Sequence, residues 1–343
     1  MRFPWANLAL LALVALQLVT GFAGLLGASD PCRVFFWIHA VGAYAILVVL
    51  SAKALIIADV LRRRPGLDPE RLLLALMILL LVAVLTTGLV WITSGPHSLA
   101  GYSLINLHAF LAVVLALLLA KHAFDRHWIA RVAASHDRRA FVRFAGLAAA
   151  GIVLWQVERP LQRLLDLPGA RRRFTGSYER GSFSTEFPSV SWLNDDPGPI
   201  DAGSWRLVVD GAVERSLELR YADLAGMQRS SRAAVLDCTG GWYAEQRWTG
   251  VPVAALLDAA GIQDEAESVS VESVTGYARR FSLEQAQELL LATEVAGAAL
   301  AHGHGFPARL VVPDRRGFDW VKWVVRLRVL RSSNLFQPPL PLS

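Results

Sequence analysis

Cysteine is nearly absent from this chain of 343 residues, which contains only Cys32 and Cys238. Two cysteines cannot build the disulfide framework of a small secreted domain, and the cysteine spacing of a zinc finger does not occur. The sequence also has no internal repeat, no low-complexity tract and no Gly-x-Gly-x-x-Gly segment after a strand-like run. These absences argue against a repeat architecture and against a nicotinamide-dinucleotide site.

The charge balance does not point to a nucleic-acid partner. The net charge is +5, but the basic residues are scattered along the chain instead of forming a patch. Hydrophobicity, in contrast, is concentrated in the first half, and the second half has the composition of an ordinary soluble domain. We therefore expect a transmembrane helical domain at 1–157, a linker at 158–186 and a separate domain at 187–343.

The first half contains five apolar runs that are candidates for membrane spans. Four of them reach the roughly 20 residues that a bilayer requires, and the fifth is shorter. A cleavable signal peptide is a poor interpretation of the start, because apolar runs continue behind it. The expected spans are Ala6–Ala28, Val34–Val60, Leu72–Ser94, Ser103–Phe124 and Phe141–Val157.

Positive charge in the loops predicts the orientation of these spans. Lysine and arginine flank the second and fourth loops, which places those loops and the N-terminus in the cytoplasm and the C-terminal domain outside. These basic residues are Arg62, Arg63, Arg64, Arg71, Lys121, Arg126, Arg131, Arg138 and Arg139. Five arginines directly after the fifth span oppose this orientation, but long translocated domains follow the rule poorly. They are Arg159, Arg163, Arg171, Arg172 and Arg173.

The pair Arg138-Arg139 before the fifth span resembles an internal twin-arginine export signal. Such a signal suits a domain that has to receive a buried cofactor, and therefore to fold, before it crosses the membrane. The alternative is an ordinary basic flank of a transmembrane helix.

Two histidines lie about five residues inside the expected spans, or about 8 Å of helix rise from the same side of the membrane. His39 and His108 are therefore expected at one depth, which suits the two axial ligands of a b-type haem. The alternative is two unrelated interfacial histidines. His122 would need a partner where the sequence has Lys53, a poor ligand, so we expect one haem and not two; His97 is a further candidate ligand or quinone neighbour.

Cys238 ends an apolar, strand-like run and stands before the turn residues Gly240 and Gly241, with Trp242 next to them. Glycine lets a backbone approach a bulky ligand closely, and a thiolate at such a place is a soft metal ligand. The alternative is a buried free cysteine that only fills space.

Three further motifs follow Cys-x-Gly-Gly-Trp in the chain. They are Trp-x-Gly-Val-Pro at 248–252, His-Gly-x-Pro-x-Arg at 304–309 and Gly-x-x-x-Val-Lys-Trp at 317–323. In this order the four motifs resemble the oxidoreductase molybdopterin-binding domain, the family of sulfite oxidase and of the periplasmic methionine-sulfoxide reductase catalytic subunit. The resemblance covers roughly residues 187–330 and implies a sulfite-oxidase-like α+β domain that binds molybdopterin.

The resemblance also implies roles for individual residues. Cys238 would be the protein ligand to molybdenum, and His304 and Arg309 would hold the phosphate end of the pterin, where a planar guanidinium suits a phosphate. Lys322 and the backbone near Trp320 would complete that site. Looser matches place pterin contacts at Thr275 and Asn194. Without the resemblance, His304 reads as a turn residue and Lys322 as the solvated position of a strand.

Strand-like and helical runs alternate irregularly in this half, which favours an α+β domain over a doubly wound sheet. The expected strands are Trp205–Val209, Ala233–Leu236, Ser268–Val274, Arg309–Val312 and Val321–Leu330. The expected helices are Tyr221–Ala225, Val253–Ala260 and Leu283–Ala292.

Together these features predict a molybdopterin-dependent oxidoreductase that spans the cytoplasmic membrane several times and carries its catalytic domain on the periplasmic side. The expected reaction is reduction of a sulfoxide or N-oxide with electrons from the quinone pool, relayed by haem b. The expected partners are membrane lipid, quinol and a small-molecule or sulfoxide substrate. The alternatives are oxidation of sulfite, and a membrane-anchored binding or sensor module without a cofactor.

Overall fold

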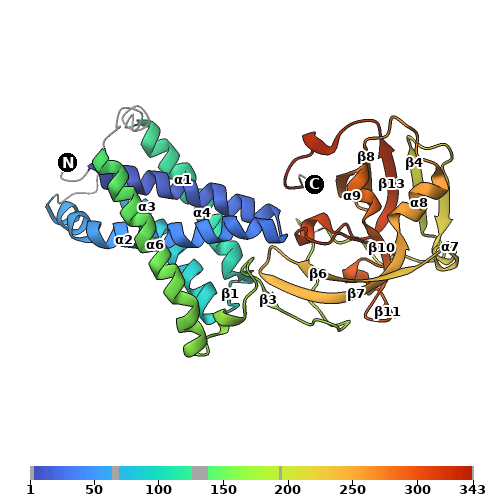
Figure 1. Ribbon diagram of the computed structural model, residues 1–343, viewed down its shortest axis with the longest axis horizontal. Helices are drawn as coiled ribbons and strands as arrows, with labels where there is room; N and C mark the ends of the chain where they lie inside the picture. Colours follow the sequence, from blue (N-terminus) through green and yellow to red (C-terminus); the bar gives the residue numbers. More distant parts are fainter. Residues whose placement is uncertain (1–3, 64–68, 126–137, 193–194, 342–343) are drawn as a thin grey trace. The chain divides into compact units, whose positions relative to one another are not determined.

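The computed structural model describes residues 4–63, 69–125, 138–192 and 195–341 (Figure 1). These residues form two compact units. The first comprises Met1–Leu25 and Ser29–Tyr178, and the second comprises Leu26–Ala28 and Glu179–Ser343. We call them the membrane unit and the catalytic unit.

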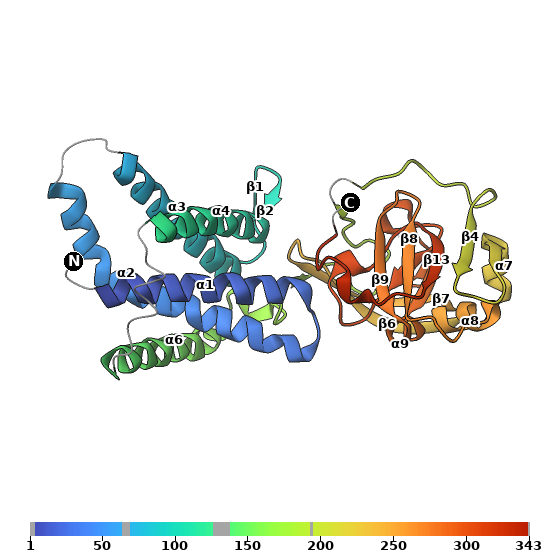
Figure 2. The same cartoon turned by 90° about the horizontal axis from the view of Figure 1, so that it is seen from above.

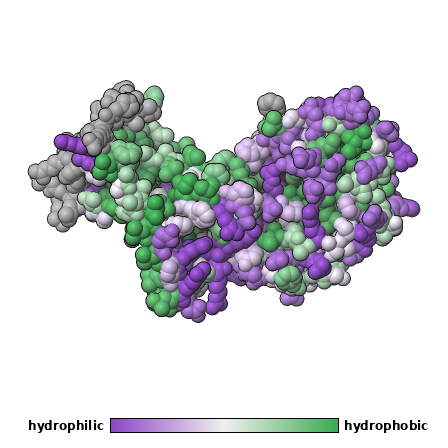
Figure 3. All heavy atoms as spheres, in the orientation of Figure 1, coloured by the Kyte–Doolittle hydropathy of each residue, from purple (hydrophilic) through white to green (hydrophobic). Residues whose placement is uncertain are grey.

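Among its described residues, the membrane unit contains five helices that are long and apolar enough to cross a bilayer, as the sequence predicts. Helix α3 lies beside α4, and α2 lies beside α6, in the views of Figure 1 and Figure 2. Hydrophobic atoms cover much of the visible surface of this unit, whereas the catalytic unit is largely hydrophilic (Figure 3). The helices are α1 (Pro4–Leu26), α2 (Arg33–Arg63), α3 (Pro69–Ser94), α4 (Leu104–Asp125) and α6 (Arg138–Leu164).

The segment expected to be a linker from residue 158 is in fact helical at its start. Helix α6 continues to Leu164 through Pro160, and the membrane unit extends to Tyr178. A proline in a helix removes one backbone hydrogen bond and normally favours a break there. Here Glu158 and Gln162, on either side of the proline, are held by other parts of the unit, so the helix is not interrupted.

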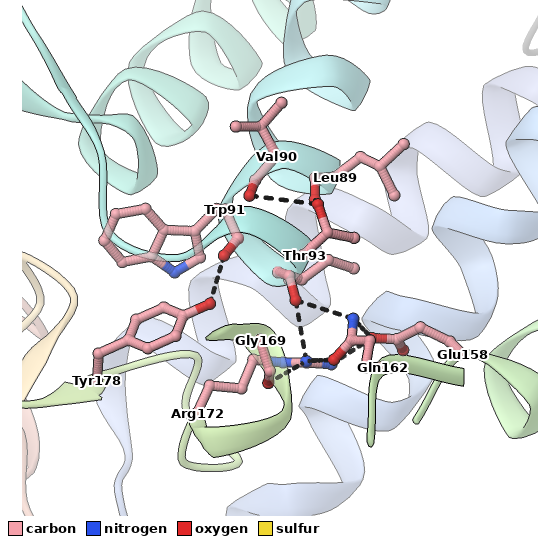
Figure 4. A network of polar contacts seen from close by, with 10 residues as sticks. Leu89, Val90, Trp91, Thr93, Glu158, Gln162, Gly169, Arg172 and Tyr178 are labelled. Atoms are coloured by element: carbon pink, nitrogen blue, oxygen red, sulfur yellow. Dashed lines mark hydrogen bonds and ion pairs between the residues drawn. The ribbon is translucent and has the colours of Figure 1, made fainter. Parts of the chain in front are cut away.

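A network of buried polar contacts joins α6 to the end of α3 (Figure 4). The guanidinium of Arg172 donates to the carboxylate of Glu158 at 2.6 Å and to the Gln162 side-chain oxygen at 2.6 Å. Arg172 and the Gln162 amide both donate to the carbonyl of Ile92, at 3.1 and 2.9 Å. These bonds satisfy a carbonyl of the last turn of α3 that has no partner inside its own helix.

The catalytic unit is built on two β-sheets (Figure 1). One has the strand order β5-β4-β13-β8-β9, with β13 parallel to β4 and its other pairings antiparallel. In the other, β7 pairs with β6 and β10, and β10 also pairs with β11 and β12. The strands are β4 (Arg206–Gly211), β5 (Leu217–Arg220), β6 (Ser230–Asp237), β7 (Trp242–Pro252), β8 (Ser268–Ser273), β9 (Ala278–Ser282), β10 (Leu290–Val295), β11 (Ala298–Ala299), β12 (Arg309–Val311) and β13 (Val324–Leu330). In the membrane unit, β1 (Ser98–Leu99) forms a short pair with β2 (Tyr102–Ser103). Strand β3 (Tyr178–Glu179) lies at the point in the sequence where the membrane unit ends and the catalytic unit continues.

One hydrophobic core joins the two sheets and the helices that accompany them. It contains buried side chains from β4, β8 and β13 together with side chains from β7 and β10. Helix α8 (Val253–Ala260) contributes Leu256 and Leu257, which are fully buried. Helices α7 (Tyr221–Gly226) and α9 (Leu283–Gln287) also belong to this unit. The unit thus combines mainly antiparallel sheets with short helices, which confirms the expected α+β class.

Two expectations about local structure were wrong. The helix expected at Leu283–Ala292 ends at Gln287, and the apolar residues after it form β10. A central strand between β7 and β12 buries Leu290 and Leu291 on both faces, and that burial outweighs their preference for a helix. The strand expected from Val321 begins only at Val324, because Trp323 adopts a positive φ of 51° that a strand cannot include.

Truncating a buried side chain in the core of the catalytic unit should lower the stability of the fold, whereas truncating an exposed one should not. Leu327 on β13 is fully buried, so Leu327→Ala should lower the free energy of unfolding by about 2–5 kcal/mol. Leu335 is 84% exposed, and Leu335→Ala should change it by less than about 0.5 kcal/mol. Urea unfolding of the detergent-solubilised chain, followed by tryptophan fluorescence, measures both; equal midpoints for the two variants would contradict the described core.

Candidate functional site

Cys238 stands in the tight connection between β6 and β7. Its backbone N–H donates to the carbonyl of Trp242 at 2.9 Å, and the N–H of Gly241 donates to the Cys238 carbonyl at 3.1 Å. The N–H of Gly240 donates to the Cys238 sulfur at 3.3 Å. Gly241 has a φ of 90°, a conformation that favours glycine. The connection therefore fixes both the backbone and the sulfur of Cys238.

A buried ion pair between Arg316 and Asp237 fixes the connection between β6 and β7. The guanidinium of Arg316 donates to the carboxylate of Asp237 at 2.7 Å and to the carbonyl of Cys238 at 3.3 Å. Both charged side chains are at most 5% exposed. Sequence reasoning missed both residues, and no spacing signal could have joined them, since they are 79 positions apart. The only hint was an aspartate at the end of an apolar run, which has to find a cation if it is buried.

The Cys238 side chain lines a pocket in the catalytic unit. Three of the sequence-predicted residues, Arg309, Trp320 and Lys322, line it together with Cys238. The remaining wall is mostly apolar and aromatic, with one carboxylate. It comprises Pro188, Ser189, Val190, Ser191, Trp192, Asp195, Leu236, Thr239, Trp242, Tyr277, Gly317 and Phe318.

Arg309 is the buried cation of the pocket. Its guanidinium lies over the rings of Trp248 and Trp320, with centroid distances of 5.5 and 5.6 Å, and donates to the carbonyl of His304 at 3.1 Å. Burial lowers the pKa of Arg309 to about 10, so the residue still carries its charge at neutral pH. Its Nε–H is buried and meets no acceptor within the described part of the chain.

Lys322 extends from the segment before β13 to the same pocket. Its ammonium donates to the hydroxyl of Ser191 at 3.1 Å and to the carbonyl of Gly303 at 3.0 Å. Burial, and next the charge of Arg309, lower the pKa of Lys322 to about 8. An anion in the pocket would be attracted by both cations and would keep Lys322 protonated.

His304 and Thr275 are not among the residues that line this pocket. The ring of His304 stacks on Phe187 with a centroid distance of 3.8 Å, and one ring nitrogen bonds to the Phe187 carbonyl at 2.8 Å. The His304 backbone carbonyl accepts from Arg309, and the ring Nδ1 is buried without a partner among the described residues. Thr275 is exposed and its hydroxyl contacts Ser273 at 3.1 Å, outside that lining. Asn194 falls outside the described residues.

The chemistry of the pocket fits a metal that arrives with ligands of its own. Among the residues that the structure describes, no three His, Cys, Asp or Glu side chains gather to hold an ion. Cys238 would thus be a single soft ligand, and a pterin dithiolene would supply the further sulfurs that molybdenum requires. Buried N–H groups of Trp242, Trp320 and Arg309 find no acceptor in the described ranges, and a large polar cofactor offers such acceptors.

The Cys238 thiol by itself is not poised to ionise. Burial raises its pKa, and the N–H of Gly240 and the charge of Arg316 only partly oppose that effect. A bound metal ion deprotonates a coordinating thiol outright. The site therefore fits a sulfur that is used as a ligand better than a free nucleophile.

The fold and this pocket define a cofactor-dependent oxidoreductase. Residues 195–335 match the family described as the oxidoreductase molybdopterin-binding domain. The uncharacterized oxidoreductase YuiH of Bacillus subtilis is 30% identical over 154 residues, which are 44% of this chain and 77% of that protein. The chain belongs to the oxidoreductase molybdopterin-binding domain family, and it is a molybdopterin-dependent enzyme.

Other relatives match smaller parts of their own length. The putative protein-methionine-sulfoxide reductase subunit YedZ1 of Azospira oryzae is 26% identical over 158 residues, 45% of this chain and 60% of that protein. Nitrate reductase [NADH] 1 of Nicotiana tabacum is 27% identical over 175 residues, 40% of this chain and 19% of that protein.

In the membrane unit, His39 on α2 and His108 on α4 face each other. Their ring centroids are 6.1 Å apart. One nitrogen of His39 bonds to the hydroxyl of Thr20 at 3.2 Å, and the same nitrogen of His108 bonds to the carbonyl of Val84 at 2.9 Å. These contacts engage the Nδ1 atom of each ring. The structure thus brings together the two histidines that the sequence paired.

Glycines make room for these rings. A Cβ at Gly21 would lie 3.1 Å from the His39 ring, and a Cβ at Gly88 would lie 3.1 Å from the His108 ring. The other candidate ligands lie elsewhere or are engaged. Lys53 donates to the side chain of Asn7, and His97 is exposed. His122 is half-buried in the last turn of α4.

The pH dependence of stability should reveal the buried amine of Lys322. Its pKa is about 8 in the native state against 10.5 in the unfolded chain. Between these values the unfolded chain binds more protons, so the free energy of unfolding contributed by this group rises with pH. From pH 8 to 10, the melting temperature of wild type should therefore rise relative to that of Lys322→Met. Both proteins are prepared from cells grown without molybdenum. Parallel profiles would show that the amine titrates normally.

Proposed function

We propose that this enzyme reduces a sulfoxide or N-oxide, using electrons that reach the Cys238 pocket from quinol through haem b in the membrane unit. The observation that carries the proposal is the presence of both sites in one chain. The Cys238 thiol lines a pocket that also holds Arg309 and Lys322, and the rings of two histidines on candidate membrane spans lie 6.1 Å apart.

The reaction balances without another reactant. Removing the oxygen atom of a sulfoxide takes two electrons and two protons and yields a sulfide and water, and oxidation of one quinol to quinone releases the same two electrons and two protons. Bound molybdopterin would supply oxygen-atom transfer. The chain would contribute Cys238 as ligand, Arg309 and Lys322 as charges that hold the anionic end of the cofactor, and aromatic walls that exclude water.

The pocket wall favours a neutral substrate. Trp192, Trp242 and Phe318 offer apolar and aromatic surface, and Asp195 places a carboxylate in the same lining. A sulfoxide carries no net charge, so it tolerates that carboxylate and does not depend on the two cations for binding. The similarity to a protein named as a methionine-sulfoxide reductase subunit supports the same choice.

The separation of the two histidines supports a bis-histidine haem. Two metal–imidazole bonds of about 2 Å each, with each nitrogen about 1.1 Å from its ring centre, require centroids roughly 6 Å apart. The observed distance is 6.1 Å. The hydrogen bonds to Thr20 and Val84 would fix the ring orientations, as outer partners of metal-bound histidines commonly do.

The proposed location is the cytoplasmic membrane, with the catalytic unit on the periplasmic side. The loop charges support this orientation, and the twin-arginine pair at Arg138 and Arg139 would suit export of a domain that already holds its cofactor. The membrane-spanning helices themselves are consistent with either direction.

Cys238→Ser should abolish sulfoxide reduction, because an alcohol is a poor ligand for the metal in place of a thiolate. We expect turnover with a dialkyl sulfoxide and a soluble electron donor to fall at least about 100-fold, with cofactor content measured in parallel. Cys32→Ser is the matched control and should leave turnover unchanged. Full activity of the Cys238→Ser variant, or faster turnover of sulfite than of the sulfoxide in the wild type, would contradict the proposal.

His39→Ala and His108→Ala should each remove the Soret absorbance of the purified chain and stop turnover with a quinol. Turnover with a soluble donor should persist, because the molybdenum pocket lies in the other unit. His97→Ala, an exposed histidine, is the control and should retain the absorbance. A wild-type chain without a Soret band, in cells that synthesise haem, would refute the relay and leave the molybdenum site intact.

A further inference from the structure

The last two turns of α6 have three chemically distinct faces. In a helix of 3.6 residues per turn, residues four apart share a face. Glu158 and Gln162 form the buried face and are bonded as described above (Figure 4). Arg159 and Arg163 form a second face, which is exposed. The buried pair thereby fixes the rotation of the helix and the direction in which the two arginines point.

The third face is apolar and exposed. Val157, Leu161 and Leu164 are 55%, 47% and 81% exposed within the membrane unit. They belong to a candidate span that reaches Leu164. Leaving three such side chains in water is costly, so this face belongs in the hydrocarbon of the bilayer. The arginines on the same two turns are then held at the level of the lipid headgroups, where long cationic side chains extend to the phosphates.

Arg159 and Arg163 differ from their basic neighbours in one respect. Arg33 pairs with Asp30, Arg171 with Asp166 and Arg172 with Glu158. Within the described part of the chain, Arg159 and Arg163 have no acidic partner at ion-pair distance. They are therefore positive charges that the membrane unit itself leaves uncompensated.

Other cations surround this pair. Arg159 lies within electrostatic range of Arg33, Arg163 and Arg172, against Glu158 as the one carboxylate that acts on it among the described residues. Arg33 and Arg173 lie over the ring of Phe174 in the same unit, at 4.7 and 5.2 Å from its centroid. The end of the bundle thus carries an excess of positive charge that an anion would relieve.

We propose that Arg159 and Arg163 bind the phosphate of an anionic phospholipid at the membrane surface where α6 ends. Two arginines one turn apart suit a phosphate, because each guanidinium offers paired donors to its oxygens. Ile152 lies two turns before Arg159 on the same face and is 46% exposed, which gives an acyl chain an apolar surface to lie on. The proposal is independent of the reaction in the catalytic unit. It also accounts for basic residues that disagree with the orientation predicted from the loops.

Native mass spectrometry of the detergent-solubilised full chain, titrated with phosphatidylglycerol or with phosphatidylcholine, tests this site. We expect wild type to prefer phosphatidylglycerol. The double variant Arg159→Gln/Arg163→Gln should weaken phosphatidylglycerol binding by about 10- to 30-fold and abolish the preference. The variant Arg159→Lys/Arg163→Lys keeps both charges and should retain most of the affinity.

The matched control removes two exposed arginines from the catalytic unit, as Arg215→Gln/Arg328→Gln, and should leave lipid binding unchanged. Melting temperatures show whether each variant is folded. Equal binding of the two lipids by wild type would overturn the proposal. So would equal losses in the two glutamine double variants, because the effect would then be one of net charge and not of a site.

Discussion

The buried ion pair between Arg316 and Asp237 is the constraint on which the catalytic site depends. Two charges removed from water are costly unless each meets the other with good geometry, and here the distance is 2.7 Å with almost no exposure. Because Arg316 also donates to the Cys238 carbonyl, the pair binds the end of β6 to the segment that leads to Trp320 and Lys322. The thiol is therefore tied to the segment that carries Trp320 and Lys322, whereas Arg309 is held separately by the His304 carbonyl.

The membrane unit obeys the same rule in a more demanding solvent. Polar groups in a bilayer have to be satisfied by the protein, and several of those in the membrane unit are bonded to helix carbonyls or to one another. Thr20 and the Val84 carbonyl hold the two histidine rings, and Gln162 and Arg172 hold the Ile92 carbonyl. Gly21 and Gly88 leave room for the rings of His39 and His108, which can therefore face each other across the bundle.

The sequence was sufficient for features that depend on local pattern, and insufficient where distant segments meet. Long apolar runs gave the five helices, and the motif around Cys238 gave the thiol at its turn. The prediction placed Leu290 and Leu291 in a helix. They form a central strand because β7 and β12 pair with them on either side, and both partners are distant in the sequence. The motif containing His304 predicted a cofactor contact; in the structure the His304 ring stacks on Phe187, and the His304 backbone carbonyl accepts a hydrogen bond from Arg309. Arg316 carried no signal of its own.

X-ray absorption at the molybdenum K-edge of the purified full chain tests the central claim most directly, because it counts the sulfur atoms around the metal. If Cys238 ligates a pterin-bound molybdenum, the wild type should show one sulfur neighbour more than Cys238→Ser, with the dithiolene sulfurs present in both. An identical sulfur count in the two proteins, or a wild type that binds no molybdenum in cells that supply it, would contradict the account.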